Sequence, residues 1–381
     1  MTTDLFGNPI GRQATFELSL HQKRQATLLY YWMSLDYLKG LLTLIDALMK
    51  GANMTLELAT LQGRDEVIAN EQWGTRDTAS NWGSLAWPAL EDFKRSTIKL
   101  MGWRAMQLYC GTGLTQCDHM LGELSPYWMT PDEKEEFDDE WTKVSRYAYN
   151  IDASTGAGTQ RPLDDTDMTL TWLESASIFP RFPKLKVRTD IVAETDQMPP
   201  RTGVYVPQDD PNGTLQFAWT GSEEGALGDC STFSDLGLRA LAAVGRDGLW
   251  VDGQAMAAFA GPLFDRGELT KRNGFSVGTE HEPEFAGSVI GRQCYTLRPC
   301  KWYFVELIEG EYEDAPSPQT EAVSVTSIRL RCEAGQPCPR EGYWFTPASN
   351  DGRRHFKQGE VMPDMKSDYG QTIWQWDQQQ G

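Results

Sequence analysis

Clustered carboxylates are the residues of this sequence with the clearest potential for chemistry. Side chains of this kind transfer protons in acid–base catalysis and bind hard cations through their oxygens. Three clusters stand out: the run DDTD at 164–167, the pair Asp247 and Asp252, and the alternating Glu280, Glu282 and Glu284. The chain has 54 acidic residues, so clusters of this size arise readily by chance. We therefore interpret each cluster first as part of a solvated face, and we predict no catalytic residue.

Cysteine and histidine spacing gives little support to a metal site. Five residues lie between the cysteines of each of two pairs, Cys294 with Cys300 and Cys332 with Cys338. Paired ligands of structural zinc sites usually have two to four residues between them. The stretch HEPEF at 281–285 lacks the second histidine of a zinc-protease helix. Convergence of the four cysteines stays open, but thiols on neighbouring strands are the favoured interpretation, so we predict no metal and no cofactor.

The segment from Pro337 to Trp376 is the most distinctive part of the sequence, because it is rich in tryptophan and arginine. Arginine forms planar, bidentate hydrogen bonds with carboxylates and phosphates. Trp, Tyr and Arg are also enriched at the energetic centres of protein interfaces. The predicted recognition surface consists of Trp344, Arg353, Arg354, His355 and Tyr369.

The alternative for the same segment is that its tryptophans fill a β core. Trp374 and Trp376 are two residues apart in the sequence. On a strand, residues at this spacing point to the same face. The spacing therefore favours a core role for at least one of them.

The formal net charge of −19 is the main clue to the kind of partner. Nucleic acid and anionic membranes attract basic surfaces, so we expect neither as a partner. Acidity for solubility alone is the favoured interpretation of this charge. The alternative is a protein partner with a basic surface, because opposite charge speeds the encounter of two proteins. The expected contacts lie in an acidic helix at 132–140 and an acidic loop at 309–314, and they are Glu135, Glu136, Asp138, Asp139, Glu311, Glu313 and Asp314.

The sequence has no recognisable targeting or membrane segment. Its start, MTTDLFGNPIGRQ, lacks the basic stretch followed by an apolar core that is typical of a secretion signal. The most apolar run, LKGLLTLIDALM, is interrupted by Lys39, Gly40 and Asp46. Seven cysteines, an odd number, do not form a complete disulfide framework. We therefore expect a cytoplasmic location and free thiols.

The first half of the sequence has the periodicity of helices. Apolar residues recur at helical spacing between Phe16 and Met49, with Gly40 as the candidate break. A second helix is predicted to start at Pro88, because proline suits the first position of a helix. A third is predicted to start after Thr130, since Glu133 follows it at capping-box spacing.

The second half has the pattern of strands. Two strand-like segments flank a tight turn at Asn212 and Gly213, and further strand patterns cover 294–309 and 323–332. We therefore predict the α+β class, with a helical N-terminal half followed by a mixed, β-rich C-terminal half. The predicted domains are 1–195, mainly helical, and 200–381, which ends in a Trp/Arg-rich module at 323–381.

Three consecutive patterns near the C-terminus resemble a known family. They are C-P-x-x-G-Y-W from Cys338, R-R-x-F-x-x-G-x-x-M-P from Arg353, and Y-G-x-T-x-W-Q-W from Tyr369. Together they resemble the C-terminal region of bacterial polymorphic-toxin immunity proteins of the types numbered seventy-one and seventy-two. The segments at 202–219 and 238–256 are similar to the same family, whereas the helical first half carries no such motif.

The resemblance implies a protein that is not an enzyme. Such proteins bind a cognate toxin and block its activity in the producing cell, and type VI secretion is a common route of toxin delivery. The resemblance implies no cofactor and no catalytic residue.

Two alternatives stay open at this point. One is a carboxylate-dependent hydrolase that reverses a toxin's modification, with the DDTD cluster and the pair Asp247 and Asp252 as its acids. The other is a chaperone or adaptor that binds an effector away from its active site.

Overall fold

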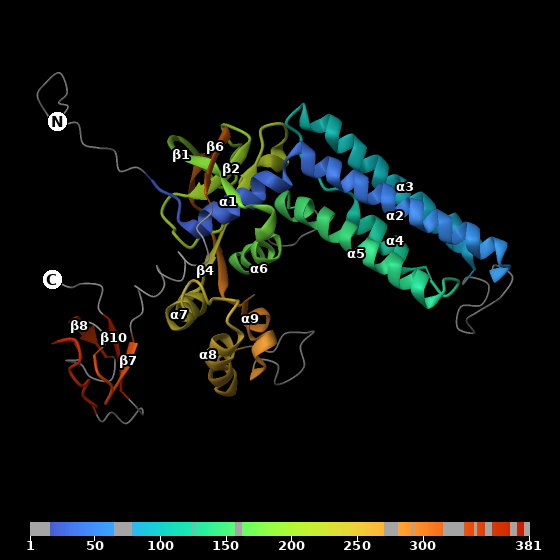
Figure 1. Cartoon of the computed structure of the whole chain (residues 1–381). Helices are drawn as coiled ribbons and strands as arrows, with labels where there is room; N and C mark the ends of the chain where they lie inside the picture. The colour runs from blue at the N-terminus through green and yellow to red at the C-terminus, as the bar shows by residue number, and fades with distance from the viewer. Residues whose placement is uncertain are drawn as a thin grey trace, which may run out of the picture. The chain divides into compact units, whose positions relative to one another are not determined.

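The computed structural model describes most of the chain as two compact units, Met1–Glu313 and Asp314–Gly381. The described residues are 16–64, 78–124, 126–156, 162–269, 281–291, 293–314, 331–338, 341–346, 353–365 and 372–376. All helices of this part lie in the first unit, while the regular elements of the second unit are strands (Figure 1). The predicted α+β class is confirmed.

Four helices of the first unit form an elongated bundle. They are α2 (Leu35–Leu61), α3 (Ala79–Arg104), α4 (Leu114–Gly122) and α5 (Pro131–Ser154). Helix α2 packs against both α3 and α5, and these three long helices lie side by side in Figure 1. The apolar stripe of α2 faces its neighbours, and its buried members include Leu38, Leu41, Ile45 and Leu48. Burial of this apolar stripe is the main contribution to the stability of the bundle.

Capping side chains decide where the bundle helices begin. Thr130 and Glu133 form a capping box at the start of α5, so the predicted start of this helix is confirmed. Helix α3 starts earlier than predicted, because the Thr78 side chain accepts a hydrogen bond from the Asn81 amide at 3.2 Å. Pro88 therefore lies inside α3 and does not begin it.

The helix predicted over 16–49 is in fact two helices. Helix α1 (Leu20–Trp32) ends just before Ser34, whose side chain caps α2 by accepting a hydrogen bond from the Tyr37 amide at 3.1 Å. The break therefore lies at this cap and not at Gly40. A Cβ added at Gly40 would lie 2.5 Å from the Tyr147 hydroxyl, so glycine permits the close packing of α5 on α2.

A four-stranded sheet is the second part of the first unit. Its strand order is β1 (Arg181–Glu194), β6 (Lys301–Asp314), β2 (Gly203–Pro207) and β3 (Gln216–Ala218). Strand β2 is antiparallel to both of its neighbours. The sequence pattern predicts β2, β3 and part of β6, but not β1.

Helix α1 attaches the sheet to the helical part of the chain. It packs against β1, β2 and β3. Its Tyr30 hydroxyl donates a hydrogen bond to the Val305 carbonyl and accepts one from the Val204 amide at 3.3 Å. Because of this anchoring, the compact units divide at Glu313–Asp314, whereas the sequence predicts a boundary between residues 195 and 200.

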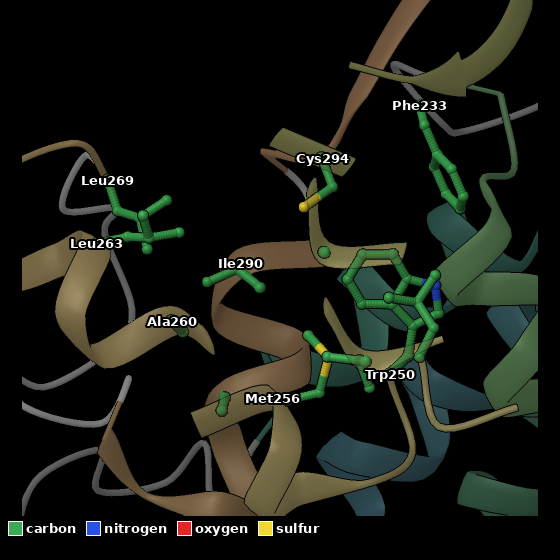
Figure 2. Close-up of a cluster of buried hydrophobic side chains, with 12 residues drawn as sticks. Phe233, Trp250, Met256, Ala260, Leu263, Leu269, Ile290 and Cys294 are labelled. Carbon is green, nitrogen blue, oxygen red and sulfur yellow. The ribbon is translucent and has the colours of Figure 1, made fainter. Parts of the chain in front are cut away.

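A small helical layer completes the first unit. Helices α7 (Asp235–Val244), α8 (Gly253–Asp265) and α9 (Pro283–Gly291) pack together beside the paired strands β4 (Cys230–Phe233) and β5 (Tyr295–Arg298). Figure 2 shows the apolar core of this layer, whose labelled members include Trp250, Met256, Ile290 and Cys294. Helix α6 (Asp165–Ser175) precedes the sheet and is followed by a short 3-10 turn at Ala176–Ile178. A second such turn lies at Glu223–Gly225.

The second unit contains an antiparallel sheet of four strands. Their order is β7 (Arg331–Glu333), β10 (Ile373–Trp376), β8 (Gly342–Phe345) and β9 (Arg353–Phe356). One side of the sheet carries a core made by Cys332, Cys338, Trp344, Phe356, Met362 and Trp374. The Trp374 indole N–H donates to the Pro363 carbonyl at 2.8 Å, so the polar end of this buried ring is satisfied.

Candidate interaction surface

Helix α5 presents a dense acidic face to solvent. Its first turn contains Asp132 and Glu133, where the helix dipole favours negative charge. The predicted contact residues follow, and Glu135, Glu136, Asp138 and Asp139 are all exposed. Asp138 pairs with Lys134. The other three have no ion pair with any residue that the structure describes.

A groove runs between α5 and the second half of α2. Its volume is about 640 Å³. The floor and one wall are apolar, with Leu48 and Ala52 buried at the base. Three large apolar side chains of α2 at this groove are unusually exposed, namely Met54 at 61%, Leu58 at 43% and Leu61 at 84%. Apolar surface gathered in this way is typical of an interaction site.

Glutamates border the groove on both sides. Glu57 lies on the α2 side, and Glu133, Glu136 and Glu140 lie on the α5 side. Glu140 pairs with Lys143 at 2.7 Å on the exposed surface, where such a pair is weak. Among the described residues, Glu57 and Glu136 have no cationic partner. The border is therefore acidic.

Glu133 differs from the other border residues because it is neutralised. Arg64 donates to both of its carboxylate oxygens, at 2.6 and 2.8 Å, and also donates to the Trp128 carbonyl at 2.9 Å. The hydrogen bonds from Arg64 are the main reason why the pKa of Glu133 is lowered. This bidentate ion pair holds the end of α2 against the start of α5 and fixes one end of the groove.

The predicted acidic loop at 309–314 is instead the end of strand β6. Glu311 pairs with Lys184 of β1 at 2.6 Å, and Glu313 pairs with Lys23 of α1 at 2.5 Å. Asp314, at the end of the strand, is exposed. Glu311 and Glu313 therefore join neighbouring elements of the fold, which makes them less available to a partner than the sequence suggests.

Strand β9 carries the basic residues of the predicted recognition surface. It is the outer strand of its sheet, and Arg353, Arg354 and His355 are all exposed. The Arg353 guanidinium lies 4.1 Å from the centre of the Tyr343 ring, and His355 meets the edge of the same ring. Because neighbours on a strand alternate between faces, Arg354 points to the opposite side from the other two.

Trp344 of the predicted surface does not fit that role. Trp344 has no exposed surface, because it lies in the core of the second unit with Trp374. It therefore cannot touch a partner while this unit is folded. The alternative of a β core is the one that the structure supports for both rings. Tyr369 lies outside the described residues.

Asp165, of the DDTD cluster, is a buried carboxylate, so the interpretation of this cluster as part of a solvated face is wrong for it. Its side chain is only 1% exposed. Its Oδ2 accepts hydrogen bonds from Arg246 at 2.8 Å and from the Trp250 indole at 2.9 Å. Its Oδ1 contacts His21, Arg246 and Gln25. The carboxylate thus ties α1, α6 and the turn between α7 and α8 together.

The surroundings of Asp165 keep it ionised. Burial alone would raise its pKa, but hydrogen bonds from His21 and Arg246 and the positive charge of Arg246 hold the pKa well below the ordinary value. Burial lowers the pKa of His21, although Asp165 acts in the opposite direction. His21 is therefore part of this buried network. A carboxylate held in this way is poorly suited to take up or release a proton during catalysis.

Other carboxylates of the predicted clusters have local structural roles. Asp164 caps α6 by accepting from the Asp167 amide at 3.0 Å, and Asp252 caps α8 by accepting from the Ala255 amide at 3.0 Å. Asp247 is exposed. Of the third cluster, Glu280 lies outside the described residues, and Glu282 and Glu284 are exposed.

The cysteines do not form a metal site in the described part of the chain. Cys294 lies in the core of the α7–α9 layer, whereas Cys300 packs against the core of the first sheet. Cys332 and Cys338 lie in the core of the second unit. No three His, Cys, Asp or Glu residues are grouped as metal ligands there, and no helix of the same residues is long and apolar enough to cross a bilayer.

Comparison with known proteins adds no relative to this description. No family model matches the sequence, and no curated protein or solved structure matches it. The geometry of the α2–α5 groove is therefore the main basis for a functional proposal, together with the C-terminal sequence patterns.

Proposed function

We propose that this protein is an immunity protein that binds a cognate bacterial toxin in the producing cell and blocks its activity by occlusion. One observation carries the proposal: exposed apolar side chains of α2 line a groove that is bordered by glutamates. This combination favours a binding protein. The resemblance of the C-terminal patterns to toxin immunity proteins supports the same function, and delivery of the toxin by type VI secretion and a cytoplasmic location belong to the proposal through that resemblance.

The physical requirements of a toxin inhibitor agree with this surface. Capture must be fast, and a net charge of −19 steers a basic partner toward the protein. Release must be slow, and desolvated apolar contacts at the centre of an interface mainly reduce the dissociation rate. The groove supplies the apolar contacts, and the acidic face of α5 supplies the attraction.

The hydrolase alternative is weaker on structural grounds. Asp165, the buried member of the DDTD cluster, is fully engaged with Arg246 and Trp250. Asp164 and Asp252 cap helices. The chaperone alternative differs from the proposal in one respect, because a chaperone binds its effector without abolishing its activity.

Stoichiometry separates these three functions. We would tag the protein in its native cell, capture it with its partner, and purify the toxin encoded by the adjacent gene. Toxin activity is then measured while the protein is added in increasing amounts. With an occluding inhibitor, toxin activity falls in proportion to the amount of protein added and reaches zero near one equivalent. Protection far below one equivalent would indicate an enzyme, and a bound but fully active toxin would indicate a chaperone.

A suitable control for this titration is Asp247→Asn, which changes one exposed carboxylate of the predicted clusters. The occlusion proposal expects an unchanged end point with this variant. If the protein neither binds nor neutralises the toxin encoded beside it, the proposal is wrong.

A further inference from the structure

The α2–α5 groove has the dimensions to bind one helix. On the α2 side the lining residues Leu48, Gly51, Ala52, Thr55 and Leu58 follow helical spacing and form a single stripe. The stretch of α2 that lines the groove, from 47 to 61, is about 21 Å long at 1.5 Å per residue. A partner helix of about four turns has this length.

The middle of the stripe is formed by small residues. A Cβ added at Gly51 would meet no atom of the described residues within 4 Å, so they leave the space above this position open. Ala52 beside it is buried at the base of the groove. Small side chains let two helix axes approach to about 8 Å, the close end of the range for packed helices. The exposed Met54, Leu58 and Leu61 then lie beside the partner helix and no longer in water.

The border determines the charge of the partner helix. An apolar stripe that enters the groove places its flanking residues opposite Glu57 on one side and Glu136 on the other. Lysine or arginine at these flanking positions would be attracted to the glutamates, whereas acidic residues would be repelled. The groove therefore favours a helix with an apolar stripe and basic flanks.

Charge also disfavours two other occupants. The chain's own segment 65–77, DEVIANEQWGTRD, has four acidic residues and one basic residue. A second copy of the protein carries the same net charge of −19. Both would bring negative charge to an acidic border.

We infer that the groove binds a basic amphipathic helix of the toxin, an inference that rests on the immunity function proposed above. The toxin helix completes the bundle at this end by covering the apolar stripe of α2. Its basic flanks pair with Glu57 and Glu136. The groove supplies the affinity, and the acidic border selects the partner.

Gly51→Leu is the decisive variant. It places a large side chain at the groove, no described atom lies within 4 Å of its Cβ, and it leaves the charge unchanged. Gly102→Leu is the matched control, because Gly102 is also an exposed helical glycine with no atom within 4 Å of an added Cβ, but it does not line the groove. Circular dichroism and thermal unfolding establish that both variants are folded.

A second pair of variants tests the border. Glu136→Lys and Glu135→Lys make the same charge change at neighbouring exposed positions of α5, but only Glu136 lines the groove. Two probes are used with all four variants. One is a fluorescein-labelled helical peptide of about 14 residues with leucines on one stripe and lysines elsewhere, and the other is the purified toxin from the adjacent gene.

The inference makes a specific set of expectations. Gly51→Leu lowers the affinity for both probes by about tenfold or more, which corresponds to a loss of about 1.4 kcal/mol of binding free energy. Gly102→Leu leaves the affinity for both probes unchanged. Glu136→Lys lowers the affinity for both probes by about threefold to tenfold, and Glu135→Lys lowers it less. A peptide with glutamates in place of the lysines does not bind.

Other results would overturn the inference or the function separately. A toxin that binds Gly51→Leu as tightly as wild type would overturn the inference and leave the immunity function intact. Groove-dependent peptide binding without any toxin binding would overturn the immunity function and leave a groove that binds basic helices. Self-association that Gly51→Leu abolishes in sedimentation would assign the groove to a second copy. Peptide binding that appears only after 65–77 is replaced by a Gly–Ser linker would assign it to the chain's own segment.

Discussion

Replacing the buried Asp152 by asparagine is expected to stabilise the protein, and to do so more strongly at higher pH. Asp152 lies near the end of α5 and is only 5% exposed. It accepts hydrogen bonds from the Thr112 amide at 2.6 Å and from the Thr112 hydroxyl at 3.0 Å. Asparagine has nearly the same shape, and its Oδ1 can still accept from the amide while its Nδ2 donates to the hydroxyl oxygen.

The size of the effect follows from the pKa of this carboxyl group. Burial raises the pKa of Asp152 from 3.8 to about 6, against the opposing effect of the two Thr112 hydrogen bonds. The folded state therefore holds the proton more tightly than the unfolded state does, and stability is lost as the pH rises through this range. At 1.36 kcal/mol per pH unit the whole loss is about 3 kcal/mol, of which about 1.4 kcal/mol falls above pH 5.

Urea unfolding followed by far-UV circular dichroism at pH 5 and pH 8 measures this effect, since all described helices belong to the first unit. Asp152→Asn is expected to gain about 1.4 kcal/mol more relative to wild type at pH 8 than at pH 5. This difference does not depend on how well the asparagine replaces the Thr112 hydrogen bonds. Asp139→Asn, on the exposed side of the same helix, is the control for net charge and should show almost no difference. An equal change at both pH values would refute the reasoning.

Three further changes test other parts of the structure. Asp165→Ala is expected to cost about 3 kcal/mol of unfolding free energy in the same assay, because it leaves Arg246 and the indole of Trp250 without their carboxylate partner; a loss under about 1 kcal/mol would argue against its structural role. Gly51→Ala is expected to add about 1 kcal/mol to the unfolding free energy, since alanine favours the helix and its Cβ meets no described neighbour; a destabilised variant would show that the site is not open. Trp344→Ala is expected to destabilise the second unit by about 3–5 kcal/mol, measured by hydrogen exchange of residues 331–376, and equal protection in the variant would contradict a core position.

Local signals in the sequence were sufficient for much of the helical part. The capping box of Thr130 and Glu133 gives the start of α5, and the apolar spacing of α2 gives its buried face. The wrong predictions are those in which a single proline or glycine suggests a helix boundary that a capping side chain in fact sets. Pro88 and Gly40 both lie inside helices, because the Thr78 and Ser34 side chains cap the amides nearby. A cap satisfies orphan N–H groups, so it fixes a helix start more firmly than a proline or glycine does.

Strand β1 has a sequence signal of its own. Leu185 and Val187 alternate with charged residues in RFPKLKVRTDIVAE, which is the pattern of a half-exposed strand. Pro183 argues against a central strand but is compatible with an outer one. Strand β1 is first in the order of its sheet, so the proline and the strand agree.

The Asp165 network could not have been predicted in the same way. His21, Asp165 and Arg246 are separated by 144 and 81 positions along the chain. Only the packing of α1 on α6 and the position of the turn after α7 bring them together. The local sequence gives the cap at Asp164, but the role of the next residue depends on tertiary structure.

The acidic residues separate into two groups that composition alone does not distinguish. The first group pairs with lysine or arginine from another part of the fold, so its charge is neutralised within the protein. It consists of Glu311 and Glu313, two of the predicted contact residues, and Glu133 at the border of the groove. Glu57 and Glu136 have no such partner among the described residues, and they face exposed apolar side chains. Charge steers a partner from a distance whichever group supplies it, but a short-range contact needs a carboxylate that is free to pair. The second group therefore defines where a partner would dock, and for this reason reversal of Glu136 is expected to change affinity more than reversal of its equally exposed neighbour Glu135.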